Sequence, residues 1–345
     1  MNLRQRINEG LEGKFKGLDN GFKDINKYIF GIQRGIYYLI GGASGTYKTT
    51  LLDYMIRHAV MSAEHQGIEC NVFYYSFEID ELTKKCNWIS GIIYDNYGIT
   101  IPPETIKGLG DFRLNTEQQE LVFQATDIIE QLFDKINFRF TPLNPTGVYS
   151  ELWKAASDKG MFSYEIYKDH DDKLQKRITG FTPANSNAYN LVALDHLYLL
   201  KKERGFQTKE VIDKMSEYFV ALRNMFGYTP IILQQFNQSL SNIDRQKFKS
   251  LDLSPAQGDF RDSTSPYADA DVVLGLMCPY KLDMSSSLGY DITKLKDKMI
   301  MLKIIKNRLS RDGIAKGLYV KPESGKFFEL PEPNSLEINK YYNNF

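Results

Sequence analysis

Cysteine is scarce in this 345-residue sequence, and the three that occur, Cys70, Cys86 and Cys278, stand far apart. Their odd number and their spacing argue against a disulfide framework and against a zinc site. The four histidines have no metal-ligand spacing either. These absences are typical of a reducing compartment, so we expect a cytoplasmic location, which is the host cytoplasm if the source is a virus.

Neither an excess of one charge nor a long apolar run is present. Lysine and arginine total 43 residues, and so do aspartate and glutamate, which leaves only local contacts for a nucleic acid. No stretch approaches the roughly 18 consecutive apolar residues of a membrane span, and the segment from Met1 to Lys16 is polar and charged. We therefore expect no signal peptide, no anchor and no membrane partner.

Short apolar runs separated by helical stretches are what the sequence does contain. Helical spacing covers 49–63 and 116–133. The runs that predict strands are 36–40, 71–75, 190–200 (apolar up to Asp195), 229–233, 270–277 and 299–305, and 317–320 and 326–330 predict an antiparallel edge. This alternation predicts an α/β fold with a doubly wound, mostly parallel sheet and helices on both faces.

One large domain over 21–330 accounts for these runs. A short helical arm, 1–20, precedes it, and a polar tail that we expect to be loosely ordered, 331–345, follows it. The pattern is least legible between Asp80 and Asn190, and we expect an insertion near 160–188.

A phosphate-binding loop is predicted between the first strand and the first long helix. The predicted nucleotide-binding residues are Gly42, Ala43, Ser44, Gly45, Thr46, Tyr47, Lys48, Thr49 and Thr50. Small residues let backbone N–H groups converge on phosphates, Lys48 adds a cation, and Thr49 offers a hydroxyl to Mg²⁺. ATP and Mg²⁺ are thus the expected ligands.

Tyr47 departs from the usual loop pattern, because glycine ordinarily stands at this position. A tyrosine fits there if its backbone angles are ordinary. A glycine-rich turn without a ligand, or a loop that no longer binds nucleotide, remains an alternative.

Three polar residues follow other predicted strands. Asp195 is placed to hold Mg²⁺ alongside Thr49, although an aspartate after a strand is often only a helix cap. Glu78 is a candidate general base, or else a carboxylate at the start of a helix. Gln235 is a candidate sensor of the γ-phosphate.

Together these segments resemble the RecA-type ATPase domain of the DnaB-like hexameric replicative helicases. The resemblance runs from about 18 to 330. It includes the loop, Ser76-Phe77-Glu78, Leu194-Asp195-His196-Leu197, Gln234-Gln235-Phe236-Asn237, Gly258-Asp259-Phe260-Arg261-Asp262-Ser263, Asp269-Ala270-Asp271-Val272-Val273 and Ile305-Lys306-Asn307-Arg308. With only the arm at 1–20 ahead of it, we expect a collarless, phage-like form.

The resemblance implies roles for these residues. Glu78 is the implied catalytic base, Asp195 the metal aspartate and Gln235 the phosphate sensor. Lys306 and Arg308 are the implied fingers that reach a neighbouring subunit's γ-phosphate, whereas the residues alone suggest exposed bases at a hairpin.

The resemblance also implies partners. The implied DNA-binding residues are Arg261 and Asp262, with local charge from Arg245, Lys247 and Lys249. The expected partners are single-stranded DNA, further copies of the chain in a ring, expected to be hexameric, and a separate primase or loader.

Two departures and two other functions stand beside this expectation. Gln234 replaces a serine before the sensor, and Thr264 replaces a glycine after Arg261. The expected function is an ATP-dependent DNA helicase acting in replication. A RecA-type recombinase or repair ATPase, or a non-hydrolysing P-loop structural protein, is the alternative.

Overall fold

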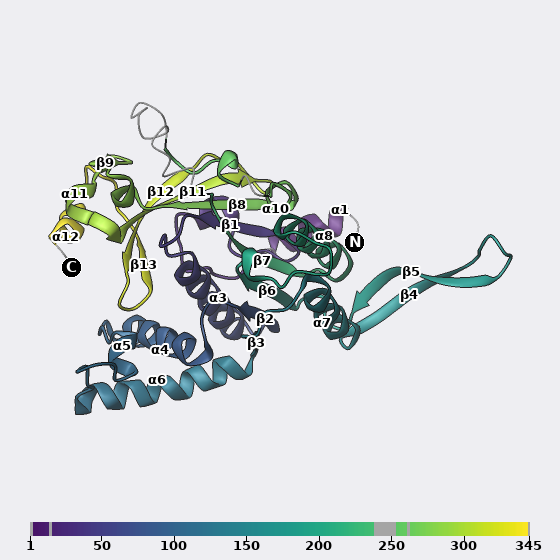
Figure 1. The fold of residues 1–345 in the computed structure, drawn as a ribbon, viewed down its shortest axis with the longest axis horizontal. Coiled ribbons are helices and arrows are strands. Elements are labelled where there is room, and N and C mark those ends of the chain that lie inside the picture. The colour runs from purple at the N-terminus through teal and green to yellow at the C-terminus, as the bar shows by residue number, and fades with distance from the viewer. Residues whose placement is uncertain (1–2, 14–15, 238–252, 261–262, 344–345) are drawn as a thin grey trace.

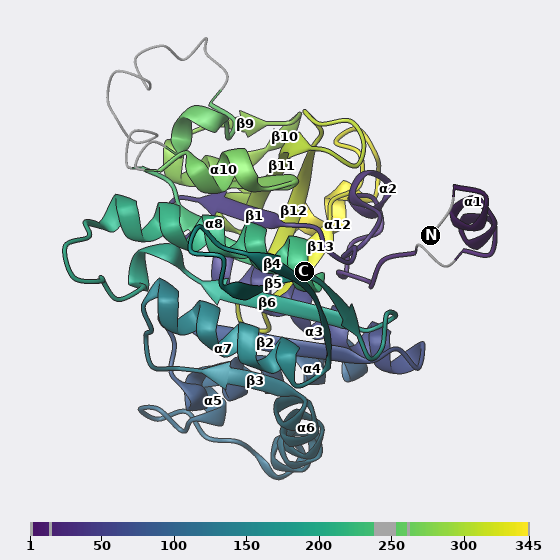
Figure 2. The ribbon, with the colours of Figure 1, turned by 90° about the vertical axis from the view of Figure 1, so that its right-hand side faces the viewer.

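Nine strands of the chain form one twisted sheet. The computed structural model describes residues 3–13, 16–237, 253–260 and 263–343. Along the sheet the order is β13-β12-β11-β8-β1-β7-β6-β2-β3. The strands are β1 (Tyr38–Gly42), β2 (Cys70–Ser76), β3 (Ile136–Arg139), β6 (Tyr189–Asp195), β7 (Thr229–Gln235), β8 (Val272–Met277), β11 (Met299–Asn307), β12 (Ala315–Lys321) and β13 (Lys326–Glu329). In Figure 2 they follow one another from β11 and β12 near the top, through β1 and β6, to β2 and β3.

The strands from β8 to β3 pair in parallel, so their carboxyl ends share one edge of the sheet. We call this the carboxyl edge and the opposite one the amino edge. β11 runs antiparallel to β8, and β12 and β13 continue antiparallel beyond it. The predicted α/β sheet and its antiparallel end are confirmed.

Helices cover both faces of this sheet. One layer holds α3 (Lys48–His65), α4 (Glu81–Tyr97), α5 (Pro103–Ile106) and α6 (Thr116–Asp134), and the other holds α7 (Pro145–Ser157), α8 (Thr208–Phe226) and α10 (Ser265–Asp269). Successive strand residues point to opposite layers: in β6, Leu191 and Ala193 pack toward the first, and Val192 and Leu194 toward the second. Both faces are therefore dry, which explains the unbroken apolar runs.

Local sequence sets where the long helices begin and end. Asp80 caps α4 by accepting a hydrogen bond from the Thr83 backbone at 3.0 Å, and Gly98 ends α4 in the left-handed conformation. Asn115 begins α6 through a capping box with Gln118.

A buried ion pair ties the loop helix to its neighbours. The fully buried Lys84 of α4 donates to Asp53 of α3 at 2.9 and 3.1 Å and to the Tyr74 hydroxyl of β2 at 3.2 Å. A charge in that position is tolerated because its partners satisfy it. The cluster holds α3 and α4 against the sheet beside the site described below.

The segment in which we expect an insertion forms an antiparallel hairpin of β4 (Gly160–Lys168) and β5 (Leu174–Pro183), separate from the main sheet. It projects from the body at the right of Figure 1. Aromatic contacts anchor its base: the Phe162 ring lies 5.7 Å from Trp153 of α7, and Phe181 lies 4.9 Å from Phe226 of α8.

The remaining elements lie at the two ends of the chain. They are α1 (Leu3–Leu11), α2 (Asn26–Ile29), β9 (Ser286–Ser287), β10 (Tyr290–Asp291), α11 (Ile292–Leu295) and α12 (Ile338–Tyr342). The expectation of a loosely ordered tail is wrong for the described part of 331–345. Ile338 of α12 is buried against Tyr290 and Leu330, because the tail carries apolar side chains that cover β10 and the end of β13.

Candidate active site

The glycine-rich loop joins β1 to α3 at the carboxyl edge, as the sequence predicts. A Cβ on Gly42 would lie 2.5 Å from the Thr46 hydroxyl, so no larger residue fits there, and Gly45 has φ +69°. The Thr46 hydroxyl donates to the Ala43 carbonyl at 2.9 Å. The loop thus holds its own curvature and turns its backbone N–H groups toward the start of the helix.

Tyr47 adopts the conformation that favours glycine, with φ 61° and ψ 30°, so the expectation of ordinary backbone angles is wrong. A non-glycine residue there costs about 1–2 kcal/mol. Two contacts compensate: the half-buried ring packs on the core, and the Tyr47 carbonyl accepts the Leu51 N–H at 2.8 Å. Burial raises the pKa of the hydroxyl to about 12.

Two lysines, not one, approach the loop. The ammonium of Lys48 donates to the Ala43 carbonyl at 2.8 Å, and that of Lys281 donates to the Gly45 carbonyl at 2.9 Å. Burial lowers the pKa of Lys48, and the charges of Asp195 and Glu78 oppose that shift. Sequence reasoning missed Lys281, because it lies 236 positions from Gly45 and only the pairing of β8 with β1 brings it there.

Asp195 ends β6 inside the protein. It pairs with Ser76 of β2, and both of its carboxylate oxygens are buried without a hydrogen bond from another described residue. Burial raises its pKa to about 6, while the Lys84 charge and the nearby Thr49 hydroxyl oppose the rise. A carboxylate left in this state needs a cation.

Glu78 and Gln235 reach the same edge. Glu78 is exposed and lies two residues beyond the end of β2, where the neighbouring Phe77 N–H donates to the Asp195 carbonyl at 3.1 Å. Gln235 ends β7 and pairs with Gly42 of the loop. Gln234 instead points inward and donates to the Ser263 carbonyl at 3.1 Å. The structure therefore brings the loop, Asp195, Glu78 and Gln235 together.

These groups suit a nucleotide with Mg²⁺. The unpaired Asp195 carboxylate and the Thr49 hydroxyl are oxygen ligands of the kind Mg²⁺ takes. Across the ranges that the structure describes, no three His, Cys, Asp or Glu side chains are arranged to bind a metal ion. This fits Mg²⁺, which usually takes one or two protein ligands together with water and substrate phosphates.

Lys306 and Arg308 lie at the other edge of the sheet. β11 is antiparallel to β8, so Asn307 pairs with Val272, the first residue of β8. Lys306 donates to the carbonyls of Tyr267 and Ala268, each at 2.8 Å, and burial lowers its pKa. Arg308 contacts Asp271 at 3.0 Å, and its side chain is 51% exposed.

The register separates this pair from the loop of its own chain. Gly42 pairs with Leu276, and Val272 lies four residues earlier on the same strand. That separation is about 13 Å along the strand alone.

The expected DNA-binding residues cannot be placed in this site. Arg261, Asp262, Arg245, Lys247 and Lys249 all lie outside the described residues. Of the other cations considered, Lys201, Lys202 and Arg204 are exposed after β6. Within the described part of the chain, no helix is long and apolar enough to cross a membrane.

Asp195→Asn should change how stability depends on pH. Because the pKa of Asp195 is about 6 when folded and near 3.8 otherwise, folding favours its protonated form, and that stabilisation is lost as the pH rises from about 4 to about 6. An amide does not titrate. Relative to wild type, the variant should gain about 3 kcal/mol of unfolding free energy between pH 4 and pH 7, measured by urea unfolding with a chelator present.

Asp80→Asn is the matched control for this measurement. Hydrogen bonds from Thr83 lower the pKa of Asp80, so the pH trend should have the opposite sign. Parallel curves for wild type and Asp195→Asn would show that Asp195 is not a buried, unpaired carboxylate.

Solved structures of other proteins have the same architecture. No family model and no curated protein sequence matches this chain. The ATPase domain of another helicase, solved as a separate domain, aligns with a TM-score of 0.69 at 17% identity, over 95% of this chain and 96% of that one. A DnaB-like replicative helicase, described with its interactions with primase, aligns with a TM-score of 0.68 at 17% identity, over 96% of this chain and 68% of that one. The chain therefore has the RecA-type fold of the ATPase domains of DnaB-like replicative helicases.

Proposed function

We propose that this chain is an ATP hydrolase of the DnaB-like helicase type, which assembles into a ring with further copies of itself and moves along single-stranded DNA. The observation that carries the proposal is the meeting of the phosphate loop, Asp195, Glu78 and Gln235 at one edge of the sheet, with Asp195 buried and unpaired. The similarity of fold supports the helicase class.

In this proposal each residue of the carboxyl edge has one task. Loop N–H groups and Lys48 bind the phosphates, and Thr49 and Asp195 hold Mg²⁺. Bound there, Mg²⁺ supplies positive charge that offsets the negative charge of the transferring phosphoryl group. Glu78 orients the attacking water and accepts its proton, and the Gln235 amide contacts the γ-phosphate.

The position of Lys281 suggests a further contact with the phosphates. Its ammonium already touches the loop at Gly45 and is exposed. The cations of the site therefore do not depend on Lys48 alone.

The ring follows from the place of Lys306 and Arg308. They lie at the amino edge, too far from the loop of the same chain to contact its nucleotide. In a head-to-tail arrangement the amino edge of one copy faces the carboxyl edge of the next, and the exposed Arg308 can reach a neighbour's γ-phosphate. The pair opposes the alternative of a non-hydrolysing structural protein.

Movement on DNA is the part of the proposal that depends on the resemblance, through the segment around Arg261. Hydrolysis of ATP should rise several-fold when single-stranded DNA is added, as measured by phosphate release, with the same amount of duplex as the comparison. Hydrolysis that DNA leaves unchanged would count against a translocase, and an absence of ATP binding would favour the structural alternative. A RecA-type recombinase would instead form open filaments, visible in negative-stain images.

Glu78→Gln should separate binding from hydrolysis. The amide keeps the size of the side chain but cannot accept the proton, so hydrolysis should fall roughly 10²-fold or more while nucleotide affinity stays near that of wild type. Affinity is measured with a fluorescent ATP analogue and turnover by phosphate release. Glu81→Gln, an exposed carboxylate at the start of α4, is the control and should keep both. Equal loss of binding and turnover would identify Glu78 as structural.

Arg308→Ala and Lys48→Ala should complement each other. Each variant alone should hydrolyse ATP poorly, because one lacks the finger and the other lacks the loop cation. In a mixed ring some interfaces join an intact loop to an intact finger, so part of the activity should return. Arg311→Ala, a nearby exposed arginine over the Tyr28 ring, is the control and should stay active alone. Mixed assemblies that form on sizing but regain no hydrolysis would contradict action across the interface.

A further inference from the structure

The β4–β5 hairpin is a two-stranded ribbon that leaves the body of the protein uncovered. Its strands extend over 9 and 10 residues, or about 30 Å. An isolated two-stranded hairpin is at best marginally stable in water. This one also exposes large apolar side chains, with Ile166 69% and Leu174 72% exposed. A ribbon of this kind gains stability when another surface covers it.

The apolar side chains of the hairpin are gathered on one face. Directly paired residues share a face, and beyond the bulge at Ser163 the pairs alternate. The apolar face holds Tyr164 with Ile178, Ile166 with Lys176, and Lys168 with Leu174. The polar face holds Glu165 with Arg177, joined by an ion pair of 2.7 Å, and Tyr167 with Gln175. The apolar face therefore carries lysines and no carboxylate.

A second surface with matching character lies on the helices α4 to α6, which we call the helical lobe. It exposes Leu109 (50%), Phe112 (60%) and Phe123 (66%). Around Phe123, α6 is acidic and contains no lysine or arginine; its acidic residues are Glu117, Glu120, Asp127, Glu130 and Asp134. An apolar and acidic surface complements an apolar and basic one. Hairpin and lobe together carry most of the exposed large apolar side chains in the described part of the chain.

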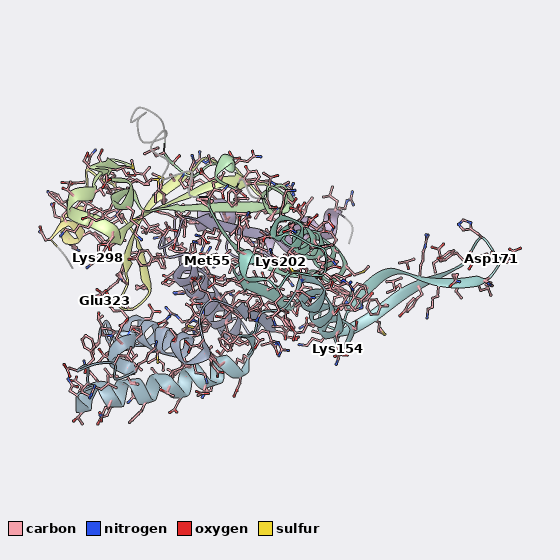
Figure 3. All side chains as sticks on the ribbon, in the orientation of Figure 1. Met55, Lys154, Asp171, Lys202, Lys298 and Glu323 are labelled. Carbon is pink, nitrogen blue, oxygen red and sulfur yellow. The ribbon has the colours of Figure 1, made fainter. Side chains whose placement is uncertain are left out.

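The two surfaces cannot meet within one chain. β6 starts six residues after β5 ends, so the base of the hairpin lies at the amino edge. α5 of the lobe lies at the carboxyl edge, where Pro103 and Glu104 line a cavity with Thr49 and Thr50 of the loop. In Figure 3, Asp171 at the hairpin tip and Glu323, beside the lobe, lie at opposite ends of the molecule.

We propose that the apolar face of the hairpin of one copy packs on the helical lobe of the next copy, around Phe123 of α6. The inference rests on the proposed ring, because Lys306 and Arg308 leave the same amino edge as the hairpin. If they face a neighbour's loop, the hairpin extends along the neighbour's lobe. The contact is heterologous: each copy offers its hairpin to one neighbour and its lobe to the other.

The charge of the hairpin favours a protein partner over a nucleic acid. Its basic residues are Lys168, Lys173, Lys176 and Arg177, and its acidic residues are Glu165, Asp169, Asp171 and Asp172. These charges balance, whereas a surface that binds phosphates independently of sequence needs net positive charge. A second copy also brings the acidic α6 that matches the lysines of the apolar face.

Ile166→Glu tests the contact, because it places a carboxylate against the acidic surface of α6. The concentration at which the chain assembles in the presence of a non-hydrolysable ATP analogue should rise tenfold or more, as measured by sedimentation. Gln175→Glu is the matched control, since it adds the same charge to the exposed polar face and should leave assembly unchanged. Circular dichroism and thermal unfolding verify that both variants are folded.

Cross-linking gives a second readout that does not depend on stability. A chain with Ile166→Cys is mixed with a differently sized chain carrying Phe123→Cys and treated with a short bis-maleimide. A heterodimer should form, and a chain with Gln175→Cys in place of Ile166→Cys should give at least tenfold less. Cys86 and Cys278 are buried and Cys70 is partly covered, so background reaction is small.

The outcomes separate this inference from the proposed function. Wild type that assembles and hydrolyses ATP, with Ile166→Glu assembling as well as Gln175→Glu and no heterodimer formed, overturns the docking and leaves the function standing. Docking shown by both readouts in a chain that hydrolyses no ATP overturns the function and leaves the docking. A wild type that stays monomeric at every concentration overturns the docking, whatever its rate of hydrolysis.

Discussion

The parallel pairing of β1, β7, β6 and β2 is the constraint on which the site depends. Each of these strands is buried on both faces, so its polar residues can appear only where the strand ends. Because the strands run the same way, those ends form a single edge, and Asp195 comes to lie beside Ser76 and Gln235 beside Gly42. No side-chain contact between these groups is required to assemble them. The hydrogen-bond register alone does it, and the loop then continues from the end of β1 into α3.

That edge stores unfavourable free energy. Asp195 has two buried oxygens without partners, and Tyr47 holds a left-handed backbone. Both features are costs to an empty site, and both are tolerated because the surroundings are rigid. The Lys84 cluster binds α3 and α4 to β2, and its charge opposes the rise in the pKa of Asp195. Such local costs are expected where a protein must bind a cation and phosphates, and they are smaller once those ligands neutralise the carboxylate.

The reversal of direction between β8 and β11 gives the sheet two chemically different edges. Parallel strands bring the loop and the carboxylates to one edge, and the antiparallel β11 returns Lys306 and Arg308 to the other. The hairpin of β4 and β5 leaves from that second edge, and the helical lobe lies near the first. A molecule with unlike edges cannot satisfy both by itself. Head-to-tail contact between copies is the arrangement in which each edge meets the other.

The sequence by itself determined the strands, the loop and the strand-end residues Asp195, Glu78 and Gln235, because unbroken apolar runs, a glycine-rich turn and their order are local signals. It did not reveal β3 or the hairpin, whose polar residues hide the strand pattern, nor the packing of Ile338. Only the tertiary structure decided that Lys281 touches Gly45, that Lys84 pairs with Asp53 and that Arg308 lies opposite its own loop. These are contacts between distant segments, set by strand order and direction, and no local pattern encodes which strand lies beside which.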